Sequence, residues 1–402
     1  MLRFNSVSVR VADSTRAVEE CIAGLYGDKE PENEGLWIVN SSIGHKLERI
    51  AGAVHSRLPG ISIVGSSCGG VIGREGAGEA MTHLAVMTVN GPADEFAWAA
   101  VDDFHGRNAR EKGLELAKAL KAKLPGASVI YLLSPGLDSC NDDLLAAFDE
   151  VFSNILIFGG ASSDNYKGIA TSQYIGDKAS PDGVWAVGFA DPTLKAAAKA
   201  THGFNAYGEP MTVTKADHNT IIELDGRPAR TTYGQRLGQG PEKDIEISLV
   251  RGGLAIELDP VSADEYGNRH ILRMGRPDDT GIIYLSVSAK EGDRFYLTTR
   301  DEDLIFSEQK KTLETLREDI AKHSLNGEIH PVAVFQSDCL LRGRTLFNKV
   351  MKDEIIAMMQ NAFMSGGEIP PWLGMYGFGE FCPLGGRNVF HTYTTSLLVL
   401  YR

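Results

Sequence analysis

The chain alternates between short apolar runs, which are typical of buried strands, and longer segments whose apolar residues recur every three or four positions, which are typical of helices. The apolar runs of the first half predict strands at residues 36–39, 61–64, 81–89, 96–101, 129–133, 154–158, 173–175 and 184–189. The helical spacing predicts helices at residues 43–58, 108–123 and 142–152. Residues 36–64 read as strand, helix, strand, which implies a parallel pair with a right-handed crossover. The pattern therefore predicts an α/β fold.

From about residue 201 the pattern changes to short strands of alternating polarity with turn signals such as Asp225-Gly226. Further apolar patterns predict helices at residues 304–323 and 347–363, a strand at 332–335 and a glycine-rich C-terminal hairpin that ends in an apolar strand. A chain of 402 residues exceeds one ordinary core. We therefore expect two α/β domains with mixed sheets, residues 1–195 and 196–402, although residues 195–199 fit either a linker or a strand.

The two ends of the chain resemble each other in the order of their elements. The first end reads WIVNSS, a helix, ISIVGSSCGGVI and MTHLAVMTV, and the second reads VAVFQSDC, a helix, PWLGMYGFGEFC and VFHTYTTSLLVLY. An internal duplication is a hypothesis that follows from this order. It would make Cys68 equivalent to Cys382 and His83 equivalent to His391, with a ligand site between the halves.

Composition excludes several classes of function. The net charge of −13 argues against binding to nucleic acid or to anionic membranes, both of which need basic patches. No apolar stretch reaches the roughly 18 residues of a membrane span, and no signal peptide is predicted. The five cysteines are widely spaced and form no CxxC pair, which favours a reduced, cytoplasmic chain without a disulfide framework.

The C-terminal hairpin concentrates the candidate chemistry, because a carboxylate, a thiol and an imidazole lie there among aromatic residues. A neutral imidazole is a common iron ligand, so His391 is the first candidate for a metal, with His83 and His202 as alternatives. A histidine that only bonds a backbone carbonyl remains the structural alternative. The candidate ligand-binding residues are His391, Tyr376, Phe378, Glu380, Cys382, Arg342, Ser67 and Cys68.

A catalytic alternative rests on Ser67, the centre of a G-x-S-x-G motif that follows a predicted strand. A hydrolase of this type requires a helix immediately after the motif, and the glycine-rich sequence VIGREGAGEA is a poor helix. No sequence feature places a base beside Cys68 or Cys382. We therefore expect no enzymatic activity and keep a serine hydrolase using Ser67 as an alternative.

Several motifs in order resemble the FIST family, whose members carry an N-terminal and a C-terminal FIST region. They are GSSCGGVI and FGGASSD in the first half, and TVTKADHNTIIELDGRPA, VFQSDCLLRGR and GFGEFCP followed by NVFH in the second. The chain departs from the family at GSSCGG, where many relatives have an acidic residue. The resemblance implies an intracellular sensor that binds a small ligand between its halves and signals through a separate partner, such as a histidine kinase.

The resemblance leaves the ligand open. Some stand-alone FIST proteins of this length bind haem and sense nitric oxide, which implies haem b, held without covalent attachment because no CxxCH is present. His391 would then hold the iron. A FIST sensor of amino acids or of different metabolites, without haem, is equally compatible with the motifs, and so is an adaptor without a ligand. The sequence leaves the oligomeric state open.

Overall fold

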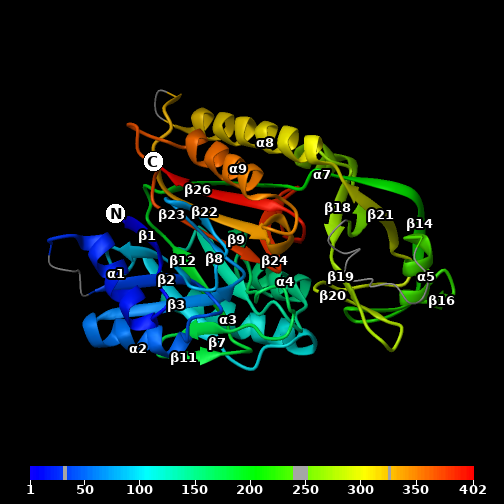
Figure 1. The fold of residues 1–402 in the computed structure, drawn as a ribbon, viewed down its shortest axis with the longest axis horizontal. Helices are drawn as coiled ribbons and strands as arrows, with labels where there is room; N and C mark the ends of the chain where they lie inside the picture. Colours follow the sequence, from blue (N-terminus) through cyan, green and yellow to red (C-terminus); the bar gives the residue numbers. More distant parts are fainter. Residues whose placement is uncertain (30–33, 239–251, 325–326) are drawn as a thin grey trace.

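A computed structural model describes residues 1–29, 34–238, 252–324 and 327–402. Strands of these residues form three six-stranded sheets and one eight-stranded sheet. The three six-stranded sheets and most of the helices form a large body, and the fourth sheet forms a smaller lobe on the right of Figure 1. The mixture of helices with parallel and antiparallel strands confirms the predicted α/β class with mixed sheets.

The body repeats one arrangement of four strands and two helices. In the first unit the second and third strands are parallel, and the fourth strand lies between the first and the second, antiparallel to both. The elements of this unit are β1 (Arg3–Arg10), α1 (Ser14–Tyr26), β2 (Gly35–Ser42), α2 (Leu47–Arg57), β3 (Ile61–Cys68) and β6 (His83–Asn90).

The same order of elements and the same strand order occur twice more. The second unit consists of β7 (Phe96–Val101), α3 (Ala109–Lys123), β8 (Val129–Ser134), α4 (Asn141–Val151), β9 (Leu156–Ala161) and β12 (Val184–Phe189). The third consists of β13 (Lys195–Thr201), α8 (Glu302–His323), β22 (Pro331–Cys339), α9 (Lys349–Ala362), β23 (Trp372–Gly377) and β26 (Thr395–Tyr401). The internal repetition is therefore threefold in topology.

A hairpin follows the third strand of each unit and joins the sheet of another unit. The hairpins are β4 (Val71–Gly73) with β5 (Gly76–Gly78), β10 (Gln173–Ile175) with β11 (Lys178–Ser180), and β24 (Gly379–Leu384) with β25 (Arg387–His391). Strand β4 pairs with β23, β10 with β3, and β24 with β9. Each unit thus adds the two strands of its hairpin to the sheet of another unit. Strands from both ends of the chain therefore lie in the same sheet.

This topology corrects the residue equivalences that the duplication hypothesis predicted. Cys68 ends β3, the third strand of its unit, whereas Cys382 lies in the exchanged hairpin strand β24. His83 begins β6, a fourth strand, whereas His391 ends the hairpin strand β25. Neither pair occupies equivalent positions.

The lobe is inserted between β13 and α8 of the third unit (Figure 1). Its elements are β14 (Phe204–Asp217), β15 (Thr220–Leu224), β16 (Arg227–Pro228), α5 (Ala229–Arg236), β17 (Leu254–Glu257), α7 (Pro260–Tyr266), β18 (His270–Arg273), β19 (Gly275–Pro277), β20 (Ile283–Leu285) and β21 (Arg294–Arg300). Residues 195–199, expected as a linker or a strand, belong to β13, which pairs with β26. The domain boundary at residues 195/196 stays a prediction.

Aromatic side chains from two sheets meet in the core of the body. The Tyr131 ring lies with its centroid 5.7 Å from that of Trp185 and 4.7 Å from that of Phe335. All three side chains are buried, and aromatic pairs at this distance add packing energy to the hydrophobic effect. The core therefore joins the second unit to the third. None of the helices in the described part of the chain combines the length and the apolar content that crossing a membrane requires.

Candidate functional site

A cleft of about 740 Å³ lies between the body and the lobe; we call it the lobe cleft. It lies beyond the carboxyl ends of the parallel strands β8 and β9, because its body side includes residues 136–139 of the loop after β8. Ligands of open α/β sheets bind at this edge, and the volume is that of a small-molecule site. Residues from β15, β19 and β20 form the lobe side. The lobe cleft is therefore the candidate functional site.

The lobe cleft contains charged groups of both signs. Arg107 and His105 come from the body, Arg276 comes from the lobe, and Asp138 lies in the loop after β8. The guanidinium of Arg107 lies 2.6 Å from Asp217, and that of Arg276 lies over the Tyr284 ring, 5.8 Å from its centroid. Arg276 is exposed and its guanidinium lies over an aromatic ring, so the guanidinium can bind an anion in the cleft.

Hydrogen bonds join the two walls of the lobe cleft. The side-chain amide of Asn219 in the lobe donates to the carbonyl of Ser139 in the body, at 3.2 Å, and to that of Leu285, at 3.0 Å. The backbone N–H of Asn141 donates to the carbonyl of Ser286 at 2.9 Å. A Cβ at Gly136 would clash with the carbonyl oxygen of Ser162, so this loop needs glycine to pack so closely. The two walls are therefore linked by direct hydrogen bonds between the body and the lobe.

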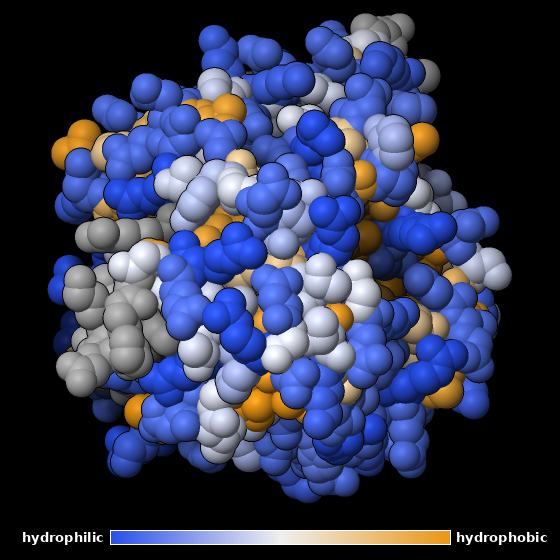
Figure 2. All heavy atoms as spheres, turned by 90° about the vertical axis from the view of Figure 1, so that its right-hand side faces the viewer, coloured by the Kyte–Doolittle hydropathy of each residue, from blue (hydrophilic) through white to orange (hydrophobic). Residues whose placement is uncertain are grey.

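The surface around the lobe is mostly hydrophilic. Figure 2 looks onto the lobe and shows hydrophobic residues only in small, separate groups. The apolar groups of the lobe cleft are instead partly covered: Phe378, Leu137 and Met274 are half-buried. The cleft therefore offers apolar contact to a ligand together with charge.

His391, the first predicted metal ligand, is fully buried away from the lobe cleft. Its Nε2 lies 3.0 Å from the carbonyl oxygen of Cys382, and its Nδ1 lies 3.3 Å from the hydroxyl of Tyr266. Burial lowers the pKa of His391 to about 3, so the ring is neutral, with Nε2–H donating to the carbonyl and Nδ1 accepting from the hydroxyl. Iron coordination by His391 stays a prediction, and it would require one of these bonds to break.

The two alternative histidines are also engaged. His202 is buried, donates from Nε2 to the carbonyl of His270 at 2.9 Å and accepts the N–H of Phe204 at Nδ1, also at 2.9 Å. His83 lies 3.1 Å through Nδ1 from the carbonyl of Ala80. Burial lowers the pKa of His202 to about 4 and also lowers that of His83. In this arrangement neither His202 nor His391 is free to bind iron, because both ring nitrogens of each histidine have hydrogen-bond partners.

Arg342 and Glu380 belong to a buried polar cluster outside the lobe cleft. Arg342 donates to the carbonyl of His202 at 3.0 Å and is 2% exposed, so it cannot meet a ligand in the lobe cleft. The Glu380 carboxyl accepts from the N–H of Thr394 at 3.3 Å and from its hydroxyl. Burial raises the pKa of Glu380 well above its usual range, which favours a protonated carboxyl. Tyr376 is buried nearby.

Ser67 is a buried structural residue in this arrangement. Its hydroxyl donates to the carbonyl of Ser163 and accepts the N–H of Ser172, both at 3.0 Å. Strand β4 begins at Val71, so the helix that a nucleophile elbow needs is replaced by a strand. Burial raises the pKa of Cys68 to about 12 and that of Cys382 above its usual range. Of the eight predicted ligand-binding residues, only Phe378 lines the lobe cleft.

The sequence interpretation missed the charged residues of the lobe cleft. Asp138 follows β8 in the segment Pro-Gly-Leu-Asp-Ser-Cys, at the carboxyl end of a parallel strand, where binding residues are expected. That position was a usable signal. The sequence contained no such signal for Arg276 and Asn219, because only the folding of the lobe against the body brings them to the site.

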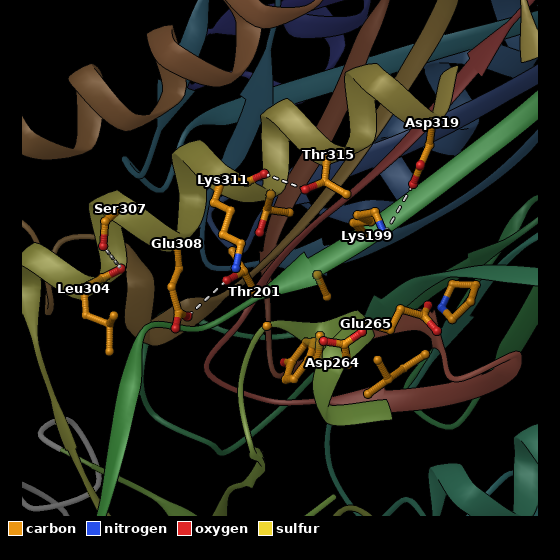
Figure 3. Close-up of a pocket in the computed structure, with 16 residues that line it drawn as sticks. Lys199, Thr201, Asp264, Glu265, Leu304, Ser307, Glu308, Lys311, Thr315 and Asp319 are labelled. Atoms are coloured by element: carbon orange, nitrogen blue, oxygen red, sulfur yellow. Dashed lines mark hydrogen bonds and ion pairs between the residues drawn. The ribbon is translucent and has the colours of Figure 1, made fainter. Parts of the chain in front are cut away.

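A second groove, of about 480 Å³, lies between α8, α7, β13 and the end of β24 (Figure 3). Its charges are partly satisfied within the groove: Lys199 pairs with Asp319 at 3.4 Å, and Glu308 accepts the N–H of Gly203 at 3.0 Å. Tyr266 lines this groove and bonds to His391, so it separates the histidine from the opening. The groove therefore gives no access to the predicted iron ligand.

Beside the lobe cleft, three potential metal ligands lie close together: Cys140, Asp143 and His218. Burial, followed by the nearby Asp143 carboxylate, raises the pKa of the Cys140 thiol to about 12. Without a cation the thiol is therefore protonated. A bound metal ion would favour the thiolate.

Sequence comparisons divide the chain into two matched regions. The profile of the FIST N domain matches residues 35–227, and that of the FIST C domain matches residues 229–383. An uncharacterized protein of Mycobacterium bovis is 27% identical over 216 residues, and one of Mycobacterium tuberculosis is 28% identical over 216 residues. These alignments cover 52% of this chain and 52% of each relative, so the chain spans about half the length of the curated relatives it matches.

Among solved structures, the Thermotoga maritima PurL complexed with ATP is 11% identical, with a TM-score of 0.21 over 100% of this chain and 71% of that chain. A likeness this distant supports no argument about this chain. The two family matches are the informative comparisons. FIST domains are associated with the sensing of small ligands in signal transduction.

Proposed function

Because the chain belongs to the FIST family, we propose that it is a sensor whose small ligand binds in the lobe cleft, and that it signals through a separate partner protein such as a histidine kinase. The observation that carries the proposal is the position of the lobe cleft. It lies at the carboxyl ends of β8 and β9 and is closed on its other side by the inserted lobe. Two-sided sites of this kind are common ligand sites in α/β proteins.

The chemistry of the lobe cleft favours a small amphiphilic ligand with a carboxylate. Arg276 on the lobe can hold a carboxylate through two parallel hydrogen bonds, and Asp138 on the body can accept from an ammonium group. Phe378 and Met274 supply apolar contact. An amino acid, or a metabolite of similar size and charge, satisfies all three kinds of contact.

Such a ligand would touch the body and the lobe at once. A ligand that contacts both parts stabilises the arrangement in which both contacts are made, at the expense of different arrangements. The lobe is joined to the body through β13–β14 and β21–α8, so a change in its position would reach α8 directly. The partner protein would then read the surface of the body and α8.

Titration calorimetry of the full chain with a panel of amino acids and small dicarboxylates tests this proposal. We expect a member of the panel to bind, and Arg276→Met or Asp138→Asn to weaken it about 10- to 100-fold, because a hydrogen bond to a charged group contributes about 1.5–3 kcal/mol. Arg269→Met is the matched control, since Arg269 is 77% exposed and pairs with Glu257 away from the lobe cleft. Equal binding by all three variants would rule out the lobe cleft.

A haem-binding form of the same sensor is the second candidate. The lobe cleft contains an imidazole, His105, and two guanidinium groups, Arg107 and Arg276, which suit an iron ligand and propionate partners respectively. Reconstitution with haem b followed by absorption spectroscopy tests it. His105→Ala would change the ferrous spectrum and its response to nitric oxide, whereas His391→Ala would not. The opposite result would place the iron at His391, and absence of a Soret band after reconstitution would refute haem binding.

A further inference from the structure

Three residues of metal-binding type meet at the seam between the body and the lobe. Cys140 immediately precedes α4, Asp143 lies in the first turn of α4, and His218 lies in the turn between β14 and β15 of the lobe. One potential ligand atom of each residue lies within 4.8 Å of the other two. The ligand atoms of a tetrahedral zinc ion lie roughly 3–4 Å apart, given bonds of about 2.0–2.3 Å. The cluster therefore needs only small side-chain movements to surround an ion.

The contacts of His218 show which of its ring nitrogens faces the cluster. One ring nitrogen, Nε2, lies 3.1 Å from a carboxylate oxygen of Asp143. The other, Nδ1, is buried and has no hydrogen-bond partner among the described residues. Nε2 therefore faces the carboxylate and is the nitrogen that can bind an ion shared with Asp143, while Nδ1 then carries the ring proton.

Hydrogen bonds hold the turn that carries His218 against its neighbours. The N–H of Ala289 donates to the carbonyl of His218 at 2.8 Å, and the Asn219 amide donates to the carbonyl of Ser139, next to Cys140, at 3.2 Å. The turn that carries His218 is thus fastened to the loop that carries Cys140. The site combines ligands from the body and the lobe.

We propose that Cys140, Asp143 and His218 bind one zinc ion that links the lobe to the body and keeps a fourth coordination position open. A thiolate, an imidazole and a carboxylate form a ligand set typical of zinc, and three protein ligands leave room for water or another ligand. The charges balance, because the thiolate and the carboxylate together offset the two positive charges of the ion. Binding releases the thiol proton to solvent.

An ion at this position would affect the shape of the lobe cleft. Ser139 and Asn219 line the lobe cleft, and each is the chain neighbour of a proposed ligand, Cys140 and His218 respectively. Zinc would therefore hold the two walls at a set separation. The metal site does not depend on the proposed ligand, since its three protein ligands all come from this chain.

The test uses the full chain without an affinity tag, reduced and freed of metal by chelation. Zinc is titrated against a chromophoric chelator, and cobalt(II) is added to a second sample for absorption spectroscopy. We expect one equivalent of zinc, and a cobalt spectrum with tetrahedral d–d bands and a sulfur-to-cobalt charge-transfer band. Cys140→Ser removes the charge-transfer band, and His218→Gln and Asp143→Asn each weaken zinc binding at least tenfold.

Cys21→Ser is the matched control, because Cys21 is also a fully buried cysteine and lies in α1. It should retain both the affinity and the cobalt spectrum, with circular dichroism confirming that every variant is folded. His218→Gln changes a partly exposed turn residue, so it tests the site even where the buried cysteine variant fails to fold. Undetectable zinc binding by the wild-type protein, or unchanged binding by His218→Gln and Asp143→Asn, would overturn the proposal.

Discussion

Replacing Glu380 by glutamine should stabilise the protein at neutral pH, although Glu380 is fully buried in β24. Burial raises the pKa of this carboxyl well above its usual range, in spite of the hydrogen bonds from Thr394, and the neighbouring Asp338 raises it further. Between the unfolded and the folded pKa, the folded protein therefore keeps the proton that the unfolded chain gives up. Folding in that pH range takes up this proton, and glutamine removes that requirement.

The sign and size of the effect follow from proton linkage. Below the unfolded pKa of about 4.3 both states are protonated, and Glu380 imposes no pH-dependent cost. Above it, the unfolded state loses its proton, and stability falls by about 1.4 kcal/mol per pH unit until the folded pKa is reached. The cost at pH 7 is thus at most about 3.7 kcal/mol, if the folded pKa lies above 7. Glutamine does not titrate and can still accept both hydrogen bonds from Thr394.

Urea unfolding at pH 5, 6 and 7, followed by tryptophan fluorescence, measures this difference. We expect the stability of Glu380→Gln relative to the wild type to increase with pH, by up to about 1.4 kcal/mol per unit. Glu354→Gln, at an exposed position of α9, is the matched control and should show a small difference at every pH. A difference for Glu380→Gln that is independent of pH would mean that the folded carboxyl is ionised, and the reasoning from burial would be wrong.

Three further predictions follow from buried groups. Asp191→Asn should lower stability by about 3 kcal/mol at pH 7, because its carboxylate accepts from Arg402 at 3.0 Å and from the N–H of Leu2 at 2.8 Å. Burial alone would raise the pKa of Asp191, but these bonds and those from Thr193 lower it below its usual range, so urea unfolding should show the loss shrinking below about pH 4. His391→Gln should gain stability relative to the wild type as pH falls from about 6.5 toward 3, because only the unfolded imidazole becomes charged; a constant difference in urea unfolding would refute this. Ser67→Ala should leave any aryl-ester hydrolysis unchanged, and a large loss in a variant with wild-type circular dichroism would restore the hydrolase interpretation.

Local patterns were sufficient for most elements and for the family. The helix predicted at residues 108–123 corresponds to α3 (Ala109–Lys123), and the strand predicted at 129–133 corresponds to β8 (Val129–Ser134). Strand β1 was missed, because its sequence RFNSVSVR forms an edge strand with little burial and few apolar residues. Helix α1 was missed with it. Helical spacing was nevertheless present in α1, whose Ala17, Val18, Cys21 and Leu25 are buried, so periodicity was a usable signal for that helix.

The candidate site depended on contacts that no local pattern contains. The aromatic residues of the C-terminal hairpin suggested a ligand site, but β24 pairs with β9 of another unit and with β25 on its other side, and His391 and Glu380 are buried. Phe378, between β23 and β24, is the one predicted ligand-binding residue that this exchange brings to the lobe cleft.

The sequence by itself determined the α/β class, most helices and strands, and membership of the FIST family, because periodicity and motif order are properties of neighbouring residues. Only the tertiary structure decided that the unit occurs three times, that the hairpins exchange between units and that Asp138 and Arg276 face one cleft. The physical reason is that hydrogen bonds between strands are made by the backbone, which is nearly the same at every residue, so a strand's sequence specifies its buried face without naming its partner.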